Sequence, residues 1–408
     1  KNTFDNVIVR NSQGNAGLDI SGADNNYVDS VGVVLDKVTY ILSNSTFDSN
    51  EGAGVKISSS SCSGCSSIKY PFDFFVDNST FSSNQGNSIS SNLGSELSPG
   101  FQISLDDYVY SGIFYIVDNL FDANLGGGIS SRSDKNVDIN IGQSVDTNSN
   151  FVYGSNTVQN NVGAGIDMNG LYNTVGNCND GIDNDLDGYI DNYDTKCSTG
   201  DFETDHASIV TGNTITGNGS SSLFGDPITG EKYLNHGGVS LYNKEDLTIE
   251  NNNFSSNHGQ NLLLANSNDV LVNNNIFDDA AFDSTVTYFD EDSANGSGML
   301  IMDVFDGEDA VLGAVSNITI TNNEFHSNDA SALVMFNLPD YNNNVSYNFG
   351  GAGIDGISIL GNNFGVAATA NSADPYSPYS ITDDAGNSLA NGAVDDPEVF
   401  IYQGANAA

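Results

Sequence analysis

Apolar and polar positions follow a short phrase that recurs along the chain. The phrase is a large apolar residue, two small residues, an Asn and then, one to three residues later, a Gly. Its clearest copies begin at Phe47, Phe81, Phe121 and Phe254. Internal repetition of this kind is typical of a solenoid, in which each repeat stacks only on its neighbours.

A short strand of alternating pattern follows most copies of the phrase. Examples are Gly54-Val-Lys-Ile57 and Gly165-Ile-Asp-Met168. Alternation places Val55 and Ile166 on the inner face and their neighbours on the outer face. Because Gly, Asn and β-branched residues all disfavour helix, the pattern predicts strands joined by polar turns.

Stacked coils bring equivalent residues together, about 4.8 Å apart along the axis. We therefore expect an internal column of aromatic rings and an internal ladder of Asn amides that bond to one another. The predicted column contains Phe47, Phe81, Phe121, Phe254, Phe277 and Phe325. The predicted ladder contains Asn50, Asn84, Asn124, Asn161, Asn218, Asn257 and Asn328.

The repeat resembles those of the right-handed parallel β-helix proteins, which include pectate lyases, alginate-modifying enzymes, tailspikes and bacterial surface proteins. The resemblance implies an all-β fold: a single-stranded right-handed parallel β-helix of about ten coils with inserted loops. We expect this helix to span residues 1–365, with an inserted loop at 176–199. Residues 366–408 lack the repeat and are expected to form a cap or a linker to a following segment.

The charge of the chain excludes some partners. It has 10 Lys and Arg against 53 Asp and Glu. Nucleic acids and anionic membrane surfaces require clustered basic residues, so neither is an expected partner. The sequence also lacks an apolar run of the length that a membrane span requires.

The four cysteines occur in two local pairs. Cys62 and Cys65 lie in one segment, and Cys178 and Cys197 in another. Their proximity indicates two local disulfides and an extracellular or cell-surface location. For Cys62 and Cys65, free thiols or half of a zinc site are the alternatives.

Between Cys178 and Cys197, Asp residues recur at the spacing of a calcium loop. Counted from Asp183, they fall at positions 1, 3, 5, 9 and 12, with Gly188 at position 6 and a backbone carbonyl at 7. The segment also resembles the thrombospondin type 3 calcium repeat. The predicted Ca²⁺ ligands are Asp183, Asp185, Asp187, Tyr189, Asp191 and Asp194.

Four charged residues on the outer side of the alternating strands are candidates for catalysis. They are Asp19, Lys56, Arg132 and Asp167, which we expect to form one column. A β-helix lyase requires a base, an acid and cations that neutralise a uronate carboxylate, and Lys56 would be the base. A solvated charged face is the alternative interpretation.

Other signatures of carbohydrate enzymes are missing. The polygalacturonase motifs and the Asp-Pro-His-Asp motif of mannuronan epimerases do not occur, and the chain has no Trp. Tyr could replace Trp as a platform for sugar rings. The tyrosines near loops or strand ends are Tyr27, Tyr70, Tyr108, Tyr110, Tyr153, Tyr172 and Tyr242.

These features favour a non-catalytic, calcium-stabilised extracellular module of a surface, adhesive or filament-forming protein. Its expected partners are further copies of the chain or a surface polysaccharide. The first alternative is a lyase or hydrolase that acts on an acidic polysaccharide. The second is a virion tailspike, which would have to form trimers.

Overall fold

The computed structural model describes 16 segments of the chain and one single residue. These are residues 1–21, 38–58, 70–85, 99–105, 110–133, 137–146, 149–170, 208–219, 237–242, 246–265, 267–281 and 296–303, followed by 315–329, 332–337, 356–364, 399–402 and the single residue 244. Every regular element in them is a β-strand. None of the described residues forms a helix that could cross a membrane.

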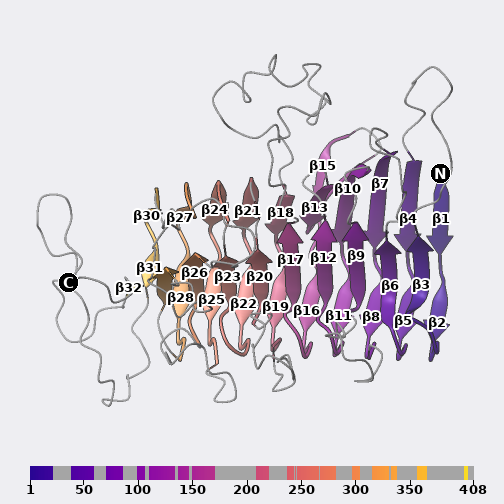
Figure 1. Cartoon of the computed structure of the whole chain (residues 1–408), viewed down its shortest axis with the longest axis horizontal. Coiled ribbons are helices and arrows are strands. Elements are labelled where there is room, and N and C mark those ends of the chain that lie inside the picture. The colour runs from indigo at the N-terminus through magenta and orange to yellow at the C-terminus, as the bar shows by residue number, and fades with distance from the viewer. Residues whose placement is uncertain are drawn as a thin grey trace, which may run out of the picture.

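Three parallel sheets of ten strands each build the molecule, and the chain visits them in turn to form a coil. The strands stack along one long axis, with the strand Asn2–Asp5 (β1) at one end of the stack and the strand Ser358–Leu360 (β30) at the other (Figure 1). Each strand pairs with the equivalent strands of the coils before and after it. The predicted all-β parallel β-helix solenoid is therefore confirmed.

Sheet A holds the first strand of each coil. Its strands are β1 (Asn2–Asp5), β4 (Val38–Ser43), β7 (Tyr70–Asp77), β10 (Tyr110–Val117), β13 (Val137–Ile141), β18 (Ser208–Thr211), β21 (Leu247–Glu250), β24 (Val270–Asn273), β27 (Thr319–Thr321) and β30 (Ser358–Leu360).

Sheet B holds the second and shortest strand. Its strands are β2 (Ile8–Arg10), β5 (Thr46–Asp48), β8 (Thr80–Ser82), β11 (Leu120–Asp122), β16 (Thr157–Gln159), β19 (Thr214–Thr216), β22 (Asn253–Ser255), β25 (Ile276–Asp278), β28 (Glu324–His326) and β31 (Asn363–Phe364).

Sheet C holds the third strand. Its strands are β3 (Ala16–Ser21), β6 (Ala53–Ser58), β9 (Phe101–Leu105), β12 (Ile129–Ser133), β17 (Ile166–Gly170), β20 (Val239–Tyr242), β23 (Leu262–Ala265), β26 (Met299–Asp303), β29 (Leu333–Asn337) and β32 (Val399–Tyr402). The last of these comes from the segment predicted to be a cap or linker, so that segment supplies one strand to the tenth coil.

The predicted aromatic column runs through the core beneath sheet B. Phe47 and Phe81 stack with ring centroids 5.4 Å apart, and Phe277 and Phe325 at 4.8 Å. In the fifth and sixth coils Val158 and Ile215 take the equivalent positions, so the column consists of two aromatic stacks separated by aliphatic residues.

The predicted Asn ladder lies at the corner between sheets B and C, and we call it the B–C ladder. The Asn84 Oδ1 accepts hydrogen bonds from the Asn50 backbone N at 3.2 Å and from the Asn50 Nδ2 at 2.8 Å. The same pattern links Asn84 to Asn124 and Asn161 to Asn218. These side chains are fully buried, so each amide satisfies polar groups that water does not reach.

A second ladder, which the sequence analysis did not identify, lies at the corner between sheets A and B. Ser45, Ser79 and Asn119 form its first rungs. It then continues through Asn residues alone: Asn156, Asn213, Asn252, Asn275, Asn323 and Asn362. We call it the A–B ladder.

The B–C ladder explains the glycine that lies at or just before the start of most strands of sheet C. A Cβ at Gly54 would lie 2.6 Å from the Gly100 carbonyl oxygen and 2.9 Å from the Asn84 Nδ2. A Cβ at Gly238 would lie 2.9 Å from the Asn257 Nδ2. The glycine of one coil therefore makes room for the ladder side chain of the next coil.

The eighth coil tests this relation, because Ala280 takes its ladder position. The preceding coil then carries Asn261 in place of the glycine. Asn257 donates to the Asn261 Oδ1 at 2.8 Å, and the Asn261 Nδ2 lies 3.3 Å from the Asn328 Oδ1. Asn261 therefore bridges the gap in the ladder.

One antiparallel hairpin interrupts the fifth coil between sheets A and B. It consists of β14 (Gln143–Val145) and β15 (Phe151–Tyr153), which lie beside β10 and β13 (Figure 1). The repeat pattern did not predict this element, because a local pairing within one coil breaks the period.

We expect Asn84→Leu to lower the free energy of unfolding by about 1–3 kcal/mol, because the amides of Asn50 would lose their acceptor. Urea denaturation of the variant and of the parent chain measures the change. Asn253→Leu is the control, since Asn253 is exposed on sheet B and should shift stability by less than about 0.5 kcal/mol. Equal effects of the two variants would contradict the structural role of the ladder.

The Asn261 bridge gives a second prediction. Asn261→Gly should destabilise the chain by removing the bridge, and Ala280→Asn should destabilise it because Asn261 already occupies that space. The double variant should recover most of the loss, since it restores the ordinary pairing of glycine and ladder Asn. A double-mutant cycle should give a coupling energy of about 1 kcal/mol or more, whereas additive effects would contradict the exchange.

Candidate functional site

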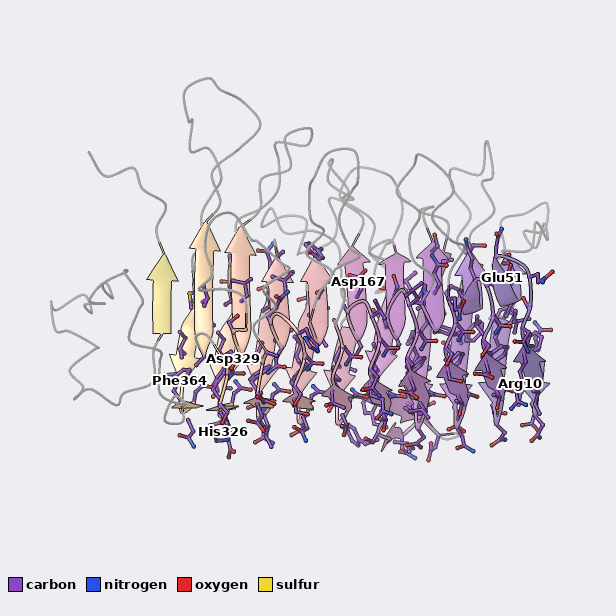
Figure 2. All side chains as sticks on the ribbon, turned by 90° about the horizontal axis from the view of Figure 1, so that it is seen from below. Arg10, Glu51, Asp167, His326, Asp329 and Phe364 are labelled. Carbon is purple, nitrogen blue, oxygen red and sulfur yellow. The ribbon has the colours of Figure 1, made fainter. Side chains whose placement is uncertain are left out.

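The outer face of sheet C carries a row of polar side chains in exact register across its first coils. Asp19 pairs with Lys56, and Lys56 pairs with Gln102. Ser130 and Asp167 continue the row in the fourth and fifth coils. Asp19 is exposed and the other four are half-buried. We call these five residues the sheet C row, and Figure 2 shows Asp167 on a different side of the solenoid from Arg10 and His326 of sheet B.

Arg132 does not belong to the sheet C row, so its predicted place in the column was wrong. Its backbone pairs with Ser104 and Asn169, two residues further along the strands. The error has a simple cause. Positions on one face of a strand recur at every second residue, and Arg132 stands two residues after Ser130, which is the residue of its strand in register with Lys56 and Gln102.

The sheet C row does not bring Lys56 and Asp167 together. Gln102 and Ser130 separate Lys56 from Asp167, so these two residues lie three coils, or roughly 14 Å, apart along the axis. General acid–base catalysis requires groups within about 3 Å of the proton that they transfer. Of the predicted catalytic set, only Asp19 and Lys56 pair directly, since Arg132 and Asp167 lie in neighbouring coils but two residues out of register.

The exposure of the outer face ends after the fifth coil. Ser240, in the sixth coil, is already fully buried. Leu263, Leu300 and Val334 follow at the equivalent positions of the next three coils and are at most 1% exposed. The accessible part of the row therefore covers the first five coils of the solenoid.

The outer face of sheet A carries a second charged cluster, which sequence reasoning missed. Tyr115 stacks on Phe75 with ring centroids 4.8 Å apart. Burial, together with the negative charges of Asp73 and Asp138, raises the pKa of Tyr115 to about 12. The phenol therefore stays protonated at physiological pH and can donate a hydrogen bond, but it cannot act as a base.

A pair of carboxylates lies where sheet A turns toward sheet B. Burial raises the pKa of Asp77, and the neighbouring charge of Asp118 raises it further. Asp118 also accepts a hydrogen bond from the Ser155 backbone N at 2.9 Å. Asp118 has a positive φ of 56°, and Asn44 and Asn78 at the equivalent corner positions have positive φ values of 51° and 45°. We therefore assign Asp118 to the turn.

The predicted calcium ligands and all four cysteines lie outside the described residues. In the part of the chain that the structure describes, no group of three or more His, Cys, Asp and Glu side chains could hold a metal ion. The calcium site and the two disulfides therefore remain predictions.

The strand register defines the chain as a parallel β-helix solenoid. No family model matches its sequence, and no curated protein matches it either. Among solved structures, the crystal structure of the periplasmic alginate epimerase AlgG aligns with a TM-score of 0.35 and 10% sequence identity. The alignment covers 79% of this chain and 76% of the epimerase.

If the acidic loop binds Ca²⁺, the ion should raise the melting temperature of the chain, because binding to the folded state alone stabilises it. Asp185→Ala combined with Asp187→Ala should abolish this rise. Differential scanning calorimetry with calcium and with a chelator measures the shift. A matched pair of changes on sheet B, Asp48→Ala and Asp122→Ala, should leave the calcium-dependent shift intact. A shift that persists in the loop variant would place the stabilising ion elsewhere.

Proposed function

We propose that the chain is a non-catalytic extracellular β-helix module that binds a polysaccharide along the outer face of sheet C. The sheet C row carries this proposal. Its five side chains come from consecutive coils, and a strand spacing of about 4.8 Å is close to the length of one sugar residue in an extended polysaccharide. Each coil can thus present one polar group to each sugar.

The geometry of the row supports binding over catalysis. Lys56 and Asp167 lie three coils apart, and Arg132 occupies another row. A row of separate hydrogen-bonding groups positions a polymer, whereas catalysis requires convergent groups around one bond. We further propose that bound calcium stabilises the module and that it belongs to a surface or adhesive protein.

The charge of the chain favours a neutral polysaccharide. The net charge is −43, and the sheet C row itself contains two carboxylates and one ammonium group. A field of this sign repels polyanions at a distance. An acidic polysaccharide would therefore need divalent cations to bridge it to the protein.

A polysaccharide lyase or hydrolase is the second candidate. Its support is the pairing of Asp19 with Lys56 in neighbouring coils, which places a carboxylate beside an amine on the exposed face. If the chain is a lyase, Lys56 would be the base that abstracts the proton from the carbon next to a uronate carboxylate.

One experiment separates the two candidates. The parent and the Lys56→Met, Asp167→Asn double variant are run through native gels that contain galactomannan, pectate or alginate, with and without calcium. They are also assayed for the ultraviolet absorbance of unsaturated products. We expect the double variant to bind galactomannan about tenfold more weakly, and we expect no product from either protein.

Matched substitutions on sheet B, Arg10→Met and Asp122→Asn, serve as the control. They make the same change of charge on another face and should leave binding intact. Turnover by the parent chain that disappears in the sheet C variant would replace the binding module with the enzyme. Equal binding by the parent and the sheet C variant would remove the row from the ligand site.

A further inference from the structure

The hairpin of β14 and β15 carries an unusual exposed surface. Phe151, Val152 and Tyr153 are 65%, 47% and 66% exposed. The other large hydrophobic side chains that are exposed in the described part of the chain, Ile8, Val38, Ile276 and Leu360, occur singly. Three consecutive exposed apolar residues on a strand are a liability that proteins usually avoid, so they indicate a contact surface.

The hairpin is held firmly, so these side chains are presented in a fixed arrangement. The Gly142 backbone N donates to the Ile116 carbonyl at 2.8 Å, and the Gly154 backbone N donates to the Gly142 carbonyl at 3.0 Å. At the turn, the Asn150 backbone N donates to the Asp146 Oδ1 at 2.9 Å. Hydrogen bonds therefore hold the hairpin both at its base and near its turn. A ligand that binds there would not have to supply the free energy needed to order it.

Phe151 and Tyr153 are separated by one residue in a strand, so they lie on the same face, about 6.8 Å apart along it. Two aromatic side chains on one face form a platform. Pyranose rings present a face of C–H groups, which pack against the electron-rich face of an aromatic ring and bury apolar area.

We propose that Phe151 and Tyr153 form an aromatic platform that binds sugar rings of a neutral polysaccharide. This inference rests on the proposed function as a polysaccharide-binding module, to which it adds a second contact site. The exposed carboxylate of Asp146 accepts a hydrogen bond from the backbone N of Asn150, which precedes Phe151 in the chain, and the whole chain is acidic, so an anionic sugar is disfavoured there.

A second copy of the chain fits this surface less well. A stable protein interface buries roughly 800 Å² on each partner and involves about 20–30 residues a side. The exposed apolar surface of the hairpin consists of three residues. Two chains of net charge −43 also repel each other. A platform of this size matches sugar rings better than it matches a folded partner.

The test compares the parent chain with the Phe151→Ala, Tyr153→Ala double variant in native gels that contain galactomannan or hydroxyethylcellulose. We expect the alanine variant to bind at least one of the two polymers about tenfold more weakly than the parent. The Phe151→Tyr, Tyr153→Phe double variant keeps both rings and should bind like the parent. Ile276→Ala removes a single exposed apolar side chain on sheet B and should also bind like the parent.

Unchanged binding by the alanine variant would overturn the platform. The Lys56→Met, Asp167→Asn variant in the same gels keeps the two proposals apart. If only the sheet C variant binds more weakly, the sheet C row is a binding site and the hairpin is not. If only the hairpin variant binds more weakly, the hairpin is a binding site and the sheet C row is not. If the parent binds neither polymer, both proposals fail.

Two further measurements complete the test. Circular dichroism melting verifies that the alanine variant folds, and Phe151→Gln combined with Tyr153→Gln replaces it if it does not. Sedimentation velocity tests the competing occupant. A concentration-dependent dimer of the parent that the hairpin variant does not form would assign the surface to a second copy and overturn the sugar platform.

Discussion

The structure depends on the satisfaction of backbone N–H groups at the corners of a narrow solenoid. At the described A–B and B–C corners the chain leaves the sheet hydrogen bonding, and the inward groups there do not meet water. The side-chain oxygen of the next coil accepts them, as the Asn84 Oδ1 does for both nitrogens of Asn50. Leaving such groups unpaired costs about 1–3 kcal/mol each. A shift of one strand along its neighbour would break the ladder bonds, so the ladders favour a single register of the sheets that they join. The glycines of sheet C and the bridging Asn261 follow from this constraint.

Much of this could be predicted from the sequence, because a ladder requires the same residue type at the same step of every coil. The B–C ladder and the Phe column repeat with few exceptions, so both could be predicted from the sequence. The A–B ladder was missed, because it begins with Ser45 and Ser79 before Asn takes over. Arg132 was misplaced because alternation gives the face of a residue but not its step along the strand. The hairpin was missed because its pairing is local and leaves no trace in the period.

The same constraint separates the parts of the chain that can vary from those that cannot. Inward positions are occupied by aromatic rings, aliphatic side chains and amides that contact the neighbouring coils. A substitution at such a position therefore disturbs those coils as well. Outward positions repeat in space without having to repeat in chemistry. The row that begins with Asp19 and Lys56 therefore becomes apolar at Leu263 without any change in the strand pairing. Function in such a fold belongs to outward rows and to insertions between strands, which is where both proposed contact sites lie.

The distribution of charge completes this division. The ladders use neutral amides and hydroxyls, so the buried corners need no ion pairs, and none of the acidic side chains whose exposure the structure describes is buried. A surface of this sign acts on every approaching ligand before any contact forms, because its field extends beyond single side chains until salt screens it. Hydroxyl-bearing polymers are not repelled, whereas a polyanion needs a bridging cation. The aromatic pair on the hairpin suits this environment, since stacking on the apolar face of a sugar requires no charge from either partner.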